Sequence, residues 1–333
     1  MLQKGALSLQ WRSEPDPEWR WSANPRIEYR HDRTLGRNLE EWRGAAGLRG
    51  RREWTGPGTA LEAGLSGESL RSDGSGSEYV LDRDALSAFA ALERSALGGT
   101  DARVGYRIAT RMFPDSVSRD HLEHFGEARL RVPVGGFSSV SAEAEISRRV
   151  TTHLVPTSRD NFWEGRSALE GEWGGESAWG LRARIEGEAV RYDLEDTTLF
   201  FDYHVARARI GPRRDSGGSS LWFGPRAEML RARLEPAEGY REIGGFADLE
   251  FAGGRAFWTL TPAAGWRAYD EDPGGTLALH SSFAFAELGL LADQPLFAGW
   301  RARLLAQTRV ESHIDSSQNG TSLYFSLDVR TLF

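Results

Sequence analysis

Hydrophobic and polar residues alternate, one by one, along most of this chain. In the segment 101–112, for example, Val104, Tyr106 and Ile108 alternate with arginine and glycine. Successive side chains of a β-strand point to opposite faces, so this period of two predicts strands with one apolar and one polar face. About sixteen segments share the pattern: 18–30, 38–50, 58–70, 78–94, 101–112, 124–134, 138–154, 162–173, 177–192, 198–210, 219–234, 239–252, 255–269, 275–289, 297–311 and 320–333.

The connections between these segments are of two alternating kinds. One kind is short and rich in glycine, as at Gly98-Gly99 and Gly135-Gly136, and glycine supplies the positive φ that tight hairpin turns need. The other kind is longer and more polar, as at 31–38, 114–121 and 313–320. The alternation predicts an antiparallel up-and-down meander with short turns at one end and longer loops at the other.

Composition narrows the class of protein. The 333 residues are 27% charged with a mean hydropathy of −0.48, and no run of 18 apolar residues exists, which excludes a spanning helix. Spanning strands are still compatible with these values, because they alternate lipid-facing and water-facing residues. The absence of Cys and the three Met suit an exported protein. A net charge of −7 without any Lys/Arg run argues against nucleic acid.

The final segment adds a resemblance. Leu323, Phe325, Leu327 and Val329 lie on one face of it, and the sequence ends on Phe333. This ending resembles the assembly signal of bacterial outer-membrane β-barrel proteins, carried by Leu327, Val329 and Phe333. The resemblance is porin-like at the level of the class. It implies an all-β, transmembrane, antiparallel up-and-down β-barrel of about 16 strands (14 to 18) in a Gram-negative envelope.

The expected domain organisation follows from the strand count. Residues 18–333 are predicted to form the barrel, with short periplasmic turns and moderately short extracellular loops. An even count from residue 18 brings both ends of the barrel to the periplasm. Residues 1–17 are expected to be an N-terminal periplasmic extension, either an extra strand or a plug. Because residues 1–5 lack the apolar core of a signal peptide, we expect that a leader has been removed.

Aromatic residues are sorted by strand end, as two belts at the two surfaces of a bilayer would be. Tryptophan is concentrated near the short turns and tyrosine near the long loops. The residues predicted to lie at the membrane interface are Trp19, Trp21, Trp173, Trp179, Trp222, Trp300, Tyr29, Tyr192, Tyr203 and Tyr269.

The polar face carries charges of both signs and is predicted to line the lumen. Across hairpins, the pattern places Arg129 opposite Glu145 and Glu170 opposite Arg182, so cross-strand ion pairs are expected. The face is interpreted either as an arginine-lined conduit for anions or as a polar wall whose charges satisfy each other. The predicted lumen-lining residues are Arg103, Arg107, Arg111, Arg129, Arg131, Glu143, Glu145, Glu170, Arg182 and Arg184.

The predicted function is a passive conduit or export pore. A sixteen-stranded barrel is too wide for side chains to fill, and no loop is long enough to fold inward as a constriction. The lumen is therefore expected to be open, or to be filled or gated by a periplasmic or lumenal protein partner. The sequence does not identify the solute or polymer that passes. One alternative is a structural barrel that houses or anchors another envelope protein.

A third hypothesis is an outer-membrane hydrolase that uses Asp and His residues at the loop end of the barrel, such as Asp120, His121 and Asp202. His121 and His124 would share a metal only if they were helical, and no third ligand is evident. No nucleophile, zinc-protease, phosphate-loop or dinucleotide motif is present. The expectation is a non-enzymatic protein in a lipid bilayer, without a catalytic residue, metal or cofactor.

Overall fold

The structure is a computed structural model of the chain. It describes residues 2–13, 19–34, 37–54, 58–75, 82–96, 98–152, 161–174, 178–194, 201–233, 236–254, 256–270, 280–296 and 299–331.

Within these residues the fold is all-β, and nineteen strands belong to one sheet. Three short 3-10 turns, η1 (Val117–Arg119), η3 (Pro236–Glu238) and η4 (Ser316–Gln318), lie in the connections. No described helix is long and apolar enough to cross a membrane. The strands are β1 (Leu2–Ser8), β2 (Trp11–Arg12), β3 (Arg20–Ala23), β4 (Arg26–Thr34), β5 (Arg37–Glu53), β6 (Thr59–Ser75), β7 (Arg83–Ser95), β8 (Asp101–Met112), β9 (His121–Pro133), β10 (Ser139–Thr151), β11 (Phe162–Trp173), β12 (Trp179–Tyr192), β13 (Tyr203–Ser216), β14 (Ser219–Ala232), β15 (Tyr240–Gly253), β16 (Ala256–Tyr269), β17 (Phe283–Pro295), β18 (Trp300–His313) and β19 (Gly320–Thr331).

Each of the sixteen predicted segments corresponds to a strand position in this sheet. The first, 18–30, contains β3 and β4, which pair with successive parts of β5 and so occupy one position. The additional position belongs to the N-terminal residues. β1 pairs with β4, from Leu2 opposite Asp32 to Ser8 opposite Arg26, and β2 pairs with β3. The described N-terminal residues thus contribute strand pairing.

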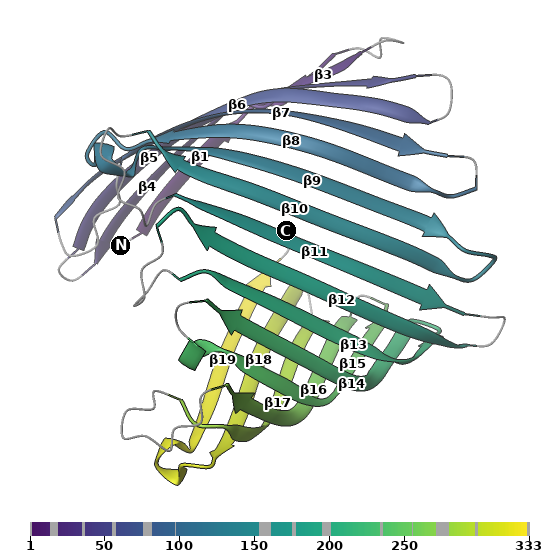
Figure 1. The fold of residues 1–333 in the computed structure, drawn as a ribbon. Helices are drawn as coiled ribbons and strands as arrows, with labels where there is room; N and C mark the ends of the chain where they lie inside the picture. Colours follow the sequence, from purple (N-terminus) through teal and green to yellow (C-terminus); the bar gives the residue numbers. More distant parts are fainter. Residues whose placement is uncertain are drawn as a thin grey trace. The chain divides into compact units, whose positions relative to one another are not determined.

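The chain forms two compact units. Unit 1 comprises Met1–Val132, Ala142–Arg166 and Val190–Asp196, and unit 2 comprises Pro133–Ser141, Ser167–Ala189 and Thr197–Phe333. In unit 1, β4 to β9 pair in chain order, each antiparallel to the next. In unit 2, β13 to β19 do the same and run side by side in Figure 1.

Two connections between strands can be compared with their predicted turn or loop. The turn between β13 and β14 is reduced to Gly217 and Gly218, and both have positive φ, of 51° and 100°, as a two-residue hairpin turn requires. The predicted polar loop at 31–38 is wrong. The β4–β5 ladder extends to the pair Thr34 and Arg37, so strand pairing occupies most of this segment.

Prolines inside strands are accommodated by gaps in the ladder. Pro225 pairs with Gly245 on β15, but the β13–β14 ladder is interrupted between Arg209 and Arg213. A proline has no backbone N–H, so it leaves one side of its strand unbonded. Gly211 lies in the interrupted part of β13. A Cβ at this position would lie 1.7 Å from the carbonyl oxygen of Phe223, so the close approach of the two backbones requires glycine.

The two faces of the strands differ in exposure. On one face, large apolar side chains are open to the surroundings: Val104 is 62% exposed, Ile185 57% and Leu327 57%. We call this the apolar face. The opposite face, which we call the charged face, carries Arg and Glu, and Glu62 and Glu242 on it are buried. A water-soluble sheet protein would hide its apolar face, so this inversion fits a lipid surrounding.

Candidate functional site

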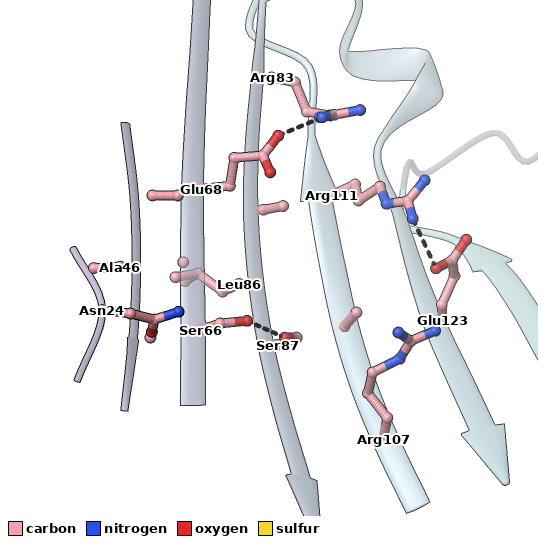
Figure 2. Close-up of a pocket in the computed structure, with 15 residues that line it drawn as sticks. Asn24, Ala46, Ser66, Glu68, Arg83, Leu86, Ser87, Arg107, Arg111 and Glu123 are labelled. Atoms are coloured by element: carbon pink, nitrogen blue, oxygen red, sulfur yellow. Dashed lines mark hydrogen bonds and ion pairs between the residues drawn. The ribbon is translucent and has the colours of Figure 1, made fainter. Parts of the chain in front are cut away.

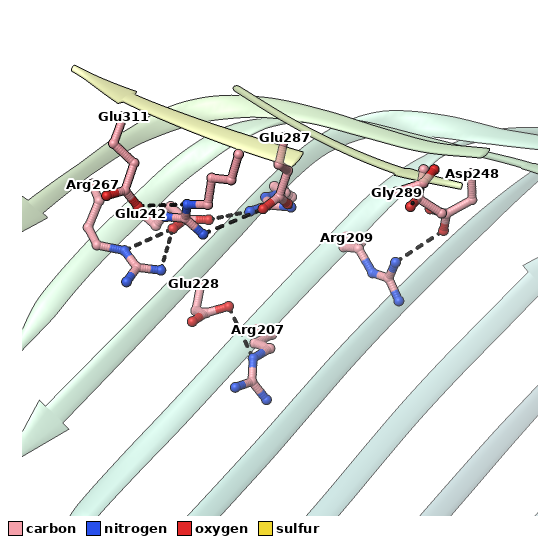
Figure 3. A network of polar contacts seen from close by, with 12 residues as sticks. Arg207, Arg209, Glu228, Glu242, Asp248, Arg267, Glu287, Gly289 and Glu311 are labelled. Carbon is pink, nitrogen blue, oxygen red and sulfur yellow. Dashed lines mark hydrogen bonds and ion pairs between the residues drawn. The ribbon is translucent and has the colours of Figure 1, made fainter. Parts of the chain in front are cut away.

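The charged face of unit 2 is centred on Glu242 of β15, which is 1% exposed. Arg226 donates to Oε1 of Glu242 at 2.6 Å, and Arg267 donates to Oε2 at 2.7 and 3.0 Å. Arg226 also donates to Glu287 at 2.7 Å. Figure 3 shows these groups together on one side of the strands. A buried carboxylate is tolerated here because both oxygens are bonded to guanidinium groups.

Two of the ion pairs on this face skip one or two strands. Arg226 on β14 reaches Glu287 on β17, and Arg209 on β13 reaches Asp248 on β15 at 3.1 Å. Neighbouring strands are spaced about 4.8 Å apart, so β14 and β17 would lie about 14 Å apart on a flat sheet. Bonds over that span require side chains that converge, so the charged face of unit 2 is the concave one.

Aromatic rings lie beneath the arginines of unit 2. The guanidinium of Arg267 lies over Tyr240 at 3.9 Å, and those of Arg182 and Arg209 lie over Trp222 at 4.5 and 4.7 Å. Cation–π contacts of this kind fix the guanidinium plane and favour the charge. The arginines are thus held by carboxylates at their edges and by rings at their faces.

The predicted pair Glu170 and Arg182 is confirmed at 2.8 Å, and Arg184 adds a second bond to Glu170 at 3.1 Å. In unit 1, Arg103 bonds Glu93 and Glu127, the latter at 2.8 Å. The predicted pair Arg129 and Glu145 is a long contact of 4.0 Å. Arg131 lies opposite Asp101 in the β8–β9 ladder.

Among the described residues, two cavities with charged linings lie on the charged face of unit 1. The larger of these two, of about 340 Å³, is lined by Asn24 and residues of β5 to β9, and Figure 2 shows Glu68 bonded to Arg83 among its lining residues. The other, of about 290 Å³, is lined by residues of β8 to β11. Arg107, Arg111 and Glu123 line both.

The aromatic residues predicted for the membrane interface divide between the two faces. Trp21, Trp173, Trp179 and Trp300 are exposed large apolar side chains, and Tyr29 packs on exposed Trp42 at 4.5 Å. Trp19 stacks on Trp21 at 5.4 Å.

The prediction that Trp222 lies at the membrane interface is wrong: its side chain is only 4% exposed and packs on Phe246, so it cannot face lipid. The same prediction needs correcting for Tyr203 and Tyr269. The Tyr203 hydroxyl donates to Glu188 at 2.9 Å, and Tyr269 stacks on His280.

Residues an even number of positions apart in one strand share a face, and this parity would have assigned these aromatic residues to the charged face. Trp222 lies four residues before Arg226, and Tyr269 two after Arg267, so within one strand each shares the face of the arginine. Tyr192 has the parity of Glu188 and buried Val190 and therefore also lies on the charged face. Strand end alone was an insufficient signal.

The histidines do not form the helical metal site considered above. His121 and His124 lie on strand β9, three residues apart, and therefore point to opposite faces. His121 is buried 3.5 Å from Glu123, whereas His124 contacts the hydroxyl of Tyr106. The carboxylate of Asp120 accepts from the backbone of Phe113 at 2.6 Å and so closes the loop.

A second polar cluster, not predicted from the sequence, joins β17, β18 and η4. Ser281 Oγ lies 2.8 Å from His313 Nδ1, and His313 Nε2 lies 3.3 Å from Glu311. These are the residue types of a hydrolase triad, but Ser281 is 1% exposed and also bonds Gln318 at 3.1 Å. The cluster closes a loop and offers no open nucleophile.

Carboxylates just outside the strands are held in the ionised state. Arg148 donates two hydrogen bonds of 2.6 Å to Asp193, and these lower the pKa of Asp193 below its usual range. Hydrogen bonds from Ser317 lower the pKa of Asp315 in the same way. Both residues follow directly on a strand end or precede a turn, so they stabilise the loop ends.

The predicted assembly-signal residues Leu327 and Val329 are exposed on β19, whereas Phe333 lies outside the described residues. Every described side chain of β19 is exposed.

Comparisons with solved structures find the same fold in outer-membrane proteins. The siderophore receptor PirA from Acinetobacter baumannii matches with a TM-score of 0.59 and 7% identity, over 98% of this chain and 64% of the receptor. The copper transporter OprC matches with a TM-score of 0.56 and 10% identity, over 98% of this chain and 62% of the transporter. PirA from Pseudomonas aeruginosa gives 0.58 and 9%, over 100% and 71%.

This chain therefore spans less than two thirds of the length of two of these proteins. No protein-family model and no curated protein matches the sequence. The fold is that of a bacterial outer-membrane β-barrel protein, built from antiparallel up-and-down strands. The outer membrane is the location that this fold supports.

Proposed function

We propose that this protein is an outer-membrane transport protein whose charged face lines a water-filled passage. One observation supports this above the others: apolar side chains are exposed on one face, while the opposite face is charged and, in unit 2, concave. Lipid suits the first surface and water the second. The passage is a passive conduit or export pore, because no described group supplies reaction chemistry or coupling.

The solved structures with this fold are receptors and a transporter by their titles, which supports transport as the general role. Siderophore or copper recognition is not carried over, since the likeness is one of fold. The self-paired arginines and glutamates of unit 2 form a hydrophilic wall without strong selectivity, as a satisfied network leaves little uncompensated charge.

The chain contains no cysteine, which permits a direct test of the passage. Adjacent residues Leu65 and Ser66 lie in the middle of β6; Leu65 is exposed on the apolar face, and Ser66 has the parity of Glu62 and Glu68 and so lies on the charged face. Single variants Leu65→Cys and Ser66→Cys would be reconstituted in planar bilayers and treated with a cationic, water-soluble thiol reagent.

The expected result is a steady current that the reagent reduces in Ser66→Cys and leaves unchanged in Leu65→Cys. Absence of current with a reactive Ser66→Cys would instead favour a filled or scaffolding barrel. Reaction at Leu65→Cys alone would invert the assignment of the faces and overturn the proposal.

A hydrolase function is tested separately with Asp202→Ala, His204→Ala and Ser281→Ala. We expect no lipid or peptide hydrolysis by the purified protein. Hydrolysis that disappears in any of these variants would contradict a purely conducting role.

A further inference from the structure

Arginines outnumber carboxylates around the smaller cavity of unit 1. On the charged face its wall carries Arg107, Arg111, Arg149 and Arg166, with Glu123, Glu145 and Glu164. Arg166 is neutralised by Glu164 at 2.6 Å. The other three arginines are not balanced in this way, and they converge on one space from β8 and β10.

Arg107 has no carboxylate within ion-pair distance among the described residues. Its guanidinium instead lies over the ring of Phe125, 5.1 Å from the ring centroid. A ring beneath the guanidinium fixes its plane and leaves the N–H groups at its edge available to a ligand. Figure 2 shows Arg107 and Arg111 projecting from one side of β8 into the space beside Glu123.

Arg111 shares its carboxylate partner with a histidine. Arg111 lies 3.4 Å from Glu123, which also faces the imidazole of His121 at 3.5 Å. Arg149 lines the same cavity, and among the described residues its buried Nε has no hydrogen-bond acceptor. Glu123 is thus shared by Arg111 and His121, and the Arg149 Nε–H remains without a partner. A buried donor of this kind is costly unless an acceptor arrives.

Unit 2 provides the contrast. There Arg226 and Arg267 each donate to Glu242 at 2.7 Å or less, and Arg226 has Glu287 as a second partner. Arg226 and Arg267 are thus neutralised by carboxylates, whereas Arg107 on the same kind of face is held by an aromatic ring alone. The N–H groups of Arg107 are therefore available to an anion.

We propose that Arg107, Arg111 and Arg149 form a binding subsite for a phosphate group. Guanidinium groups bind oxyanions through paired N–H donors, and a phosphate has enough acceptor oxygens for all three arginines. The cavity of about 290 Å³ is larger than inorganic phosphate, so it also accommodates a phosphate ester. Glu145 lies 4.0 Å from Arg129, a long contact that leaves its carboxylate as an acceptor for a hydroxyl of such an ester.

This inference rests on the proposed function in one respect, namely that the charged face is open to water. It is tested without any measurement of current. Isothermal titration calorimetry of the detergent-solubilised, folded protein would use inorganic phosphate in one arm and glycerol phosphate in the other, at constant ionic strength in chloride. Saturable binding in the millimolar range is expected in both arms, and tighter binding of glycerol phosphate would identify the ester as the better ligand.

Arg107→Gln should weaken phosphate binding about tenfold, the effect of losing one charge-assisted hydrogen bond. Arg107→Lys keeps the charge but loses the paired N–H donors of the guanidinium. Its phosphate affinity should fall between those of the wild-type protein and Arg107→Gln. The matched control is Arg103→Gln, on the same strand and face: it removes the same charge, but Arg103 is bonded to Glu93 and Glu127 and lines neither cavity. Folding of each variant would be verified on a gel, where the unheated sample should migrate fast and the heated sample slowly.

No saturable phosphate binding by the wild-type protein, or equal weakening in Arg103→Gln and Arg107→Gln, would overturn the subsite. Either result leaves the conduit standing if the planar-bilayer current is present. Conversely, phosphate binding without current would keep the subsite and remove the conduit.

Discussion

Arg267 donates two hydrogen bonds to Glu242, from Nε at 3.0 Å and from a terminal nitrogen at 2.7 Å, and both end on the same carboxylate oxygen. The other oxygen of Glu242 accepts from Arg226. This leaves Glu242 buried but fully satisfied, at the point where β14, β15 and β16 are joined by side chains as well as by their backbones.

Glu242→Ala should therefore destabilise the folded protein by about 3 kcal/mol, because two partly buried guanidinium groups lose their common partner. Urea unfolding in detergent, followed by tryptophan fluorescence, measures this change. The control is Glu250→Ala, on the same strand and face but exposed, which should change the unfolding free energy by less than about 0.5 kcal/mol. Equal effects of the two substitutions would show that the network does not stabilise the fold.

The two faces of β18 can be distinguished with neighbouring residues. Ala306 lies opposite Phe325 on the apolar face, and Gln307 lies opposite Tyr324 on the charged side. Ala306→Arg should cost about 2–4 kcal/mol in a lipid bilayer, the penalty for a cation near the middle of a membrane strand. Gln307→Arg should be nearly neutral. Reversible folding into lipid vesicles would measure both, and a larger penalty at Gln307 would contradict the assignment of the faces.

The strands were predictable because their signal is local. In β8, alternation alone identified all of the strand and the correct face for Arg103 and Val104, since side-chain direction depends only on parity. The cross-strand pair of Glu170 and Arg182 was predictable for a related reason: a short hairpin turn determines the register of both strands.

The site depended on longer-range geometry that the sequence does not carry. Arg226 and Glu287 are 61 residues apart and come together only because the face curves inward. The excess of arginine around Arg107 was likewise invisible, because counting charges along strands does not show which ones pair. The burial of Trp222 depended on that curvature too, although its parity with Arg226 was available.

Acid should weaken one loop contact selectively. Hydrogen bonds from Arg148 hold the pKa of Asp193 below its usual value, so ionised Asp193 stabilises the folded state above the unfolded pKa of about 4. This stabilisation is lost as the pH falls through the lowered pKa. Because the Asp193 side chain is 40% exposed, solvent screening limits the contribution to less than about 1 kcal/mol.

The corresponding experiment compares Asp193→Asn with the wild-type protein in urea at pH 7 and at about pH 2. The wild-type protein should be the more stable at pH 7, and the difference should shrink at the lower pH. A difference that stays constant with pH would mean that the ion pair does not contribute.

The last strand allows assembly to be separated from stability. Leu327 is exposed on the apolar face of β19, and its neighbour Ser326 has the opposite parity. If Leu327, Val329 and Phe333 are read by the assembly machinery, Leu327→Asn should lower the heat-modifiable fraction in the outer membrane severalfold, whereas Ser326→Asn should not. Both variants should refold equally well into detergent micelles, because neither side chain packs in a core. Loss of refolding in Leu327→Asn would assign the residue to stability, and equal membrane assembly of the two variants would remove it from the signal. The distinction depends on exposure: a side chain that contacts little in the folded protein can affect assembly only through what reads it beforehand.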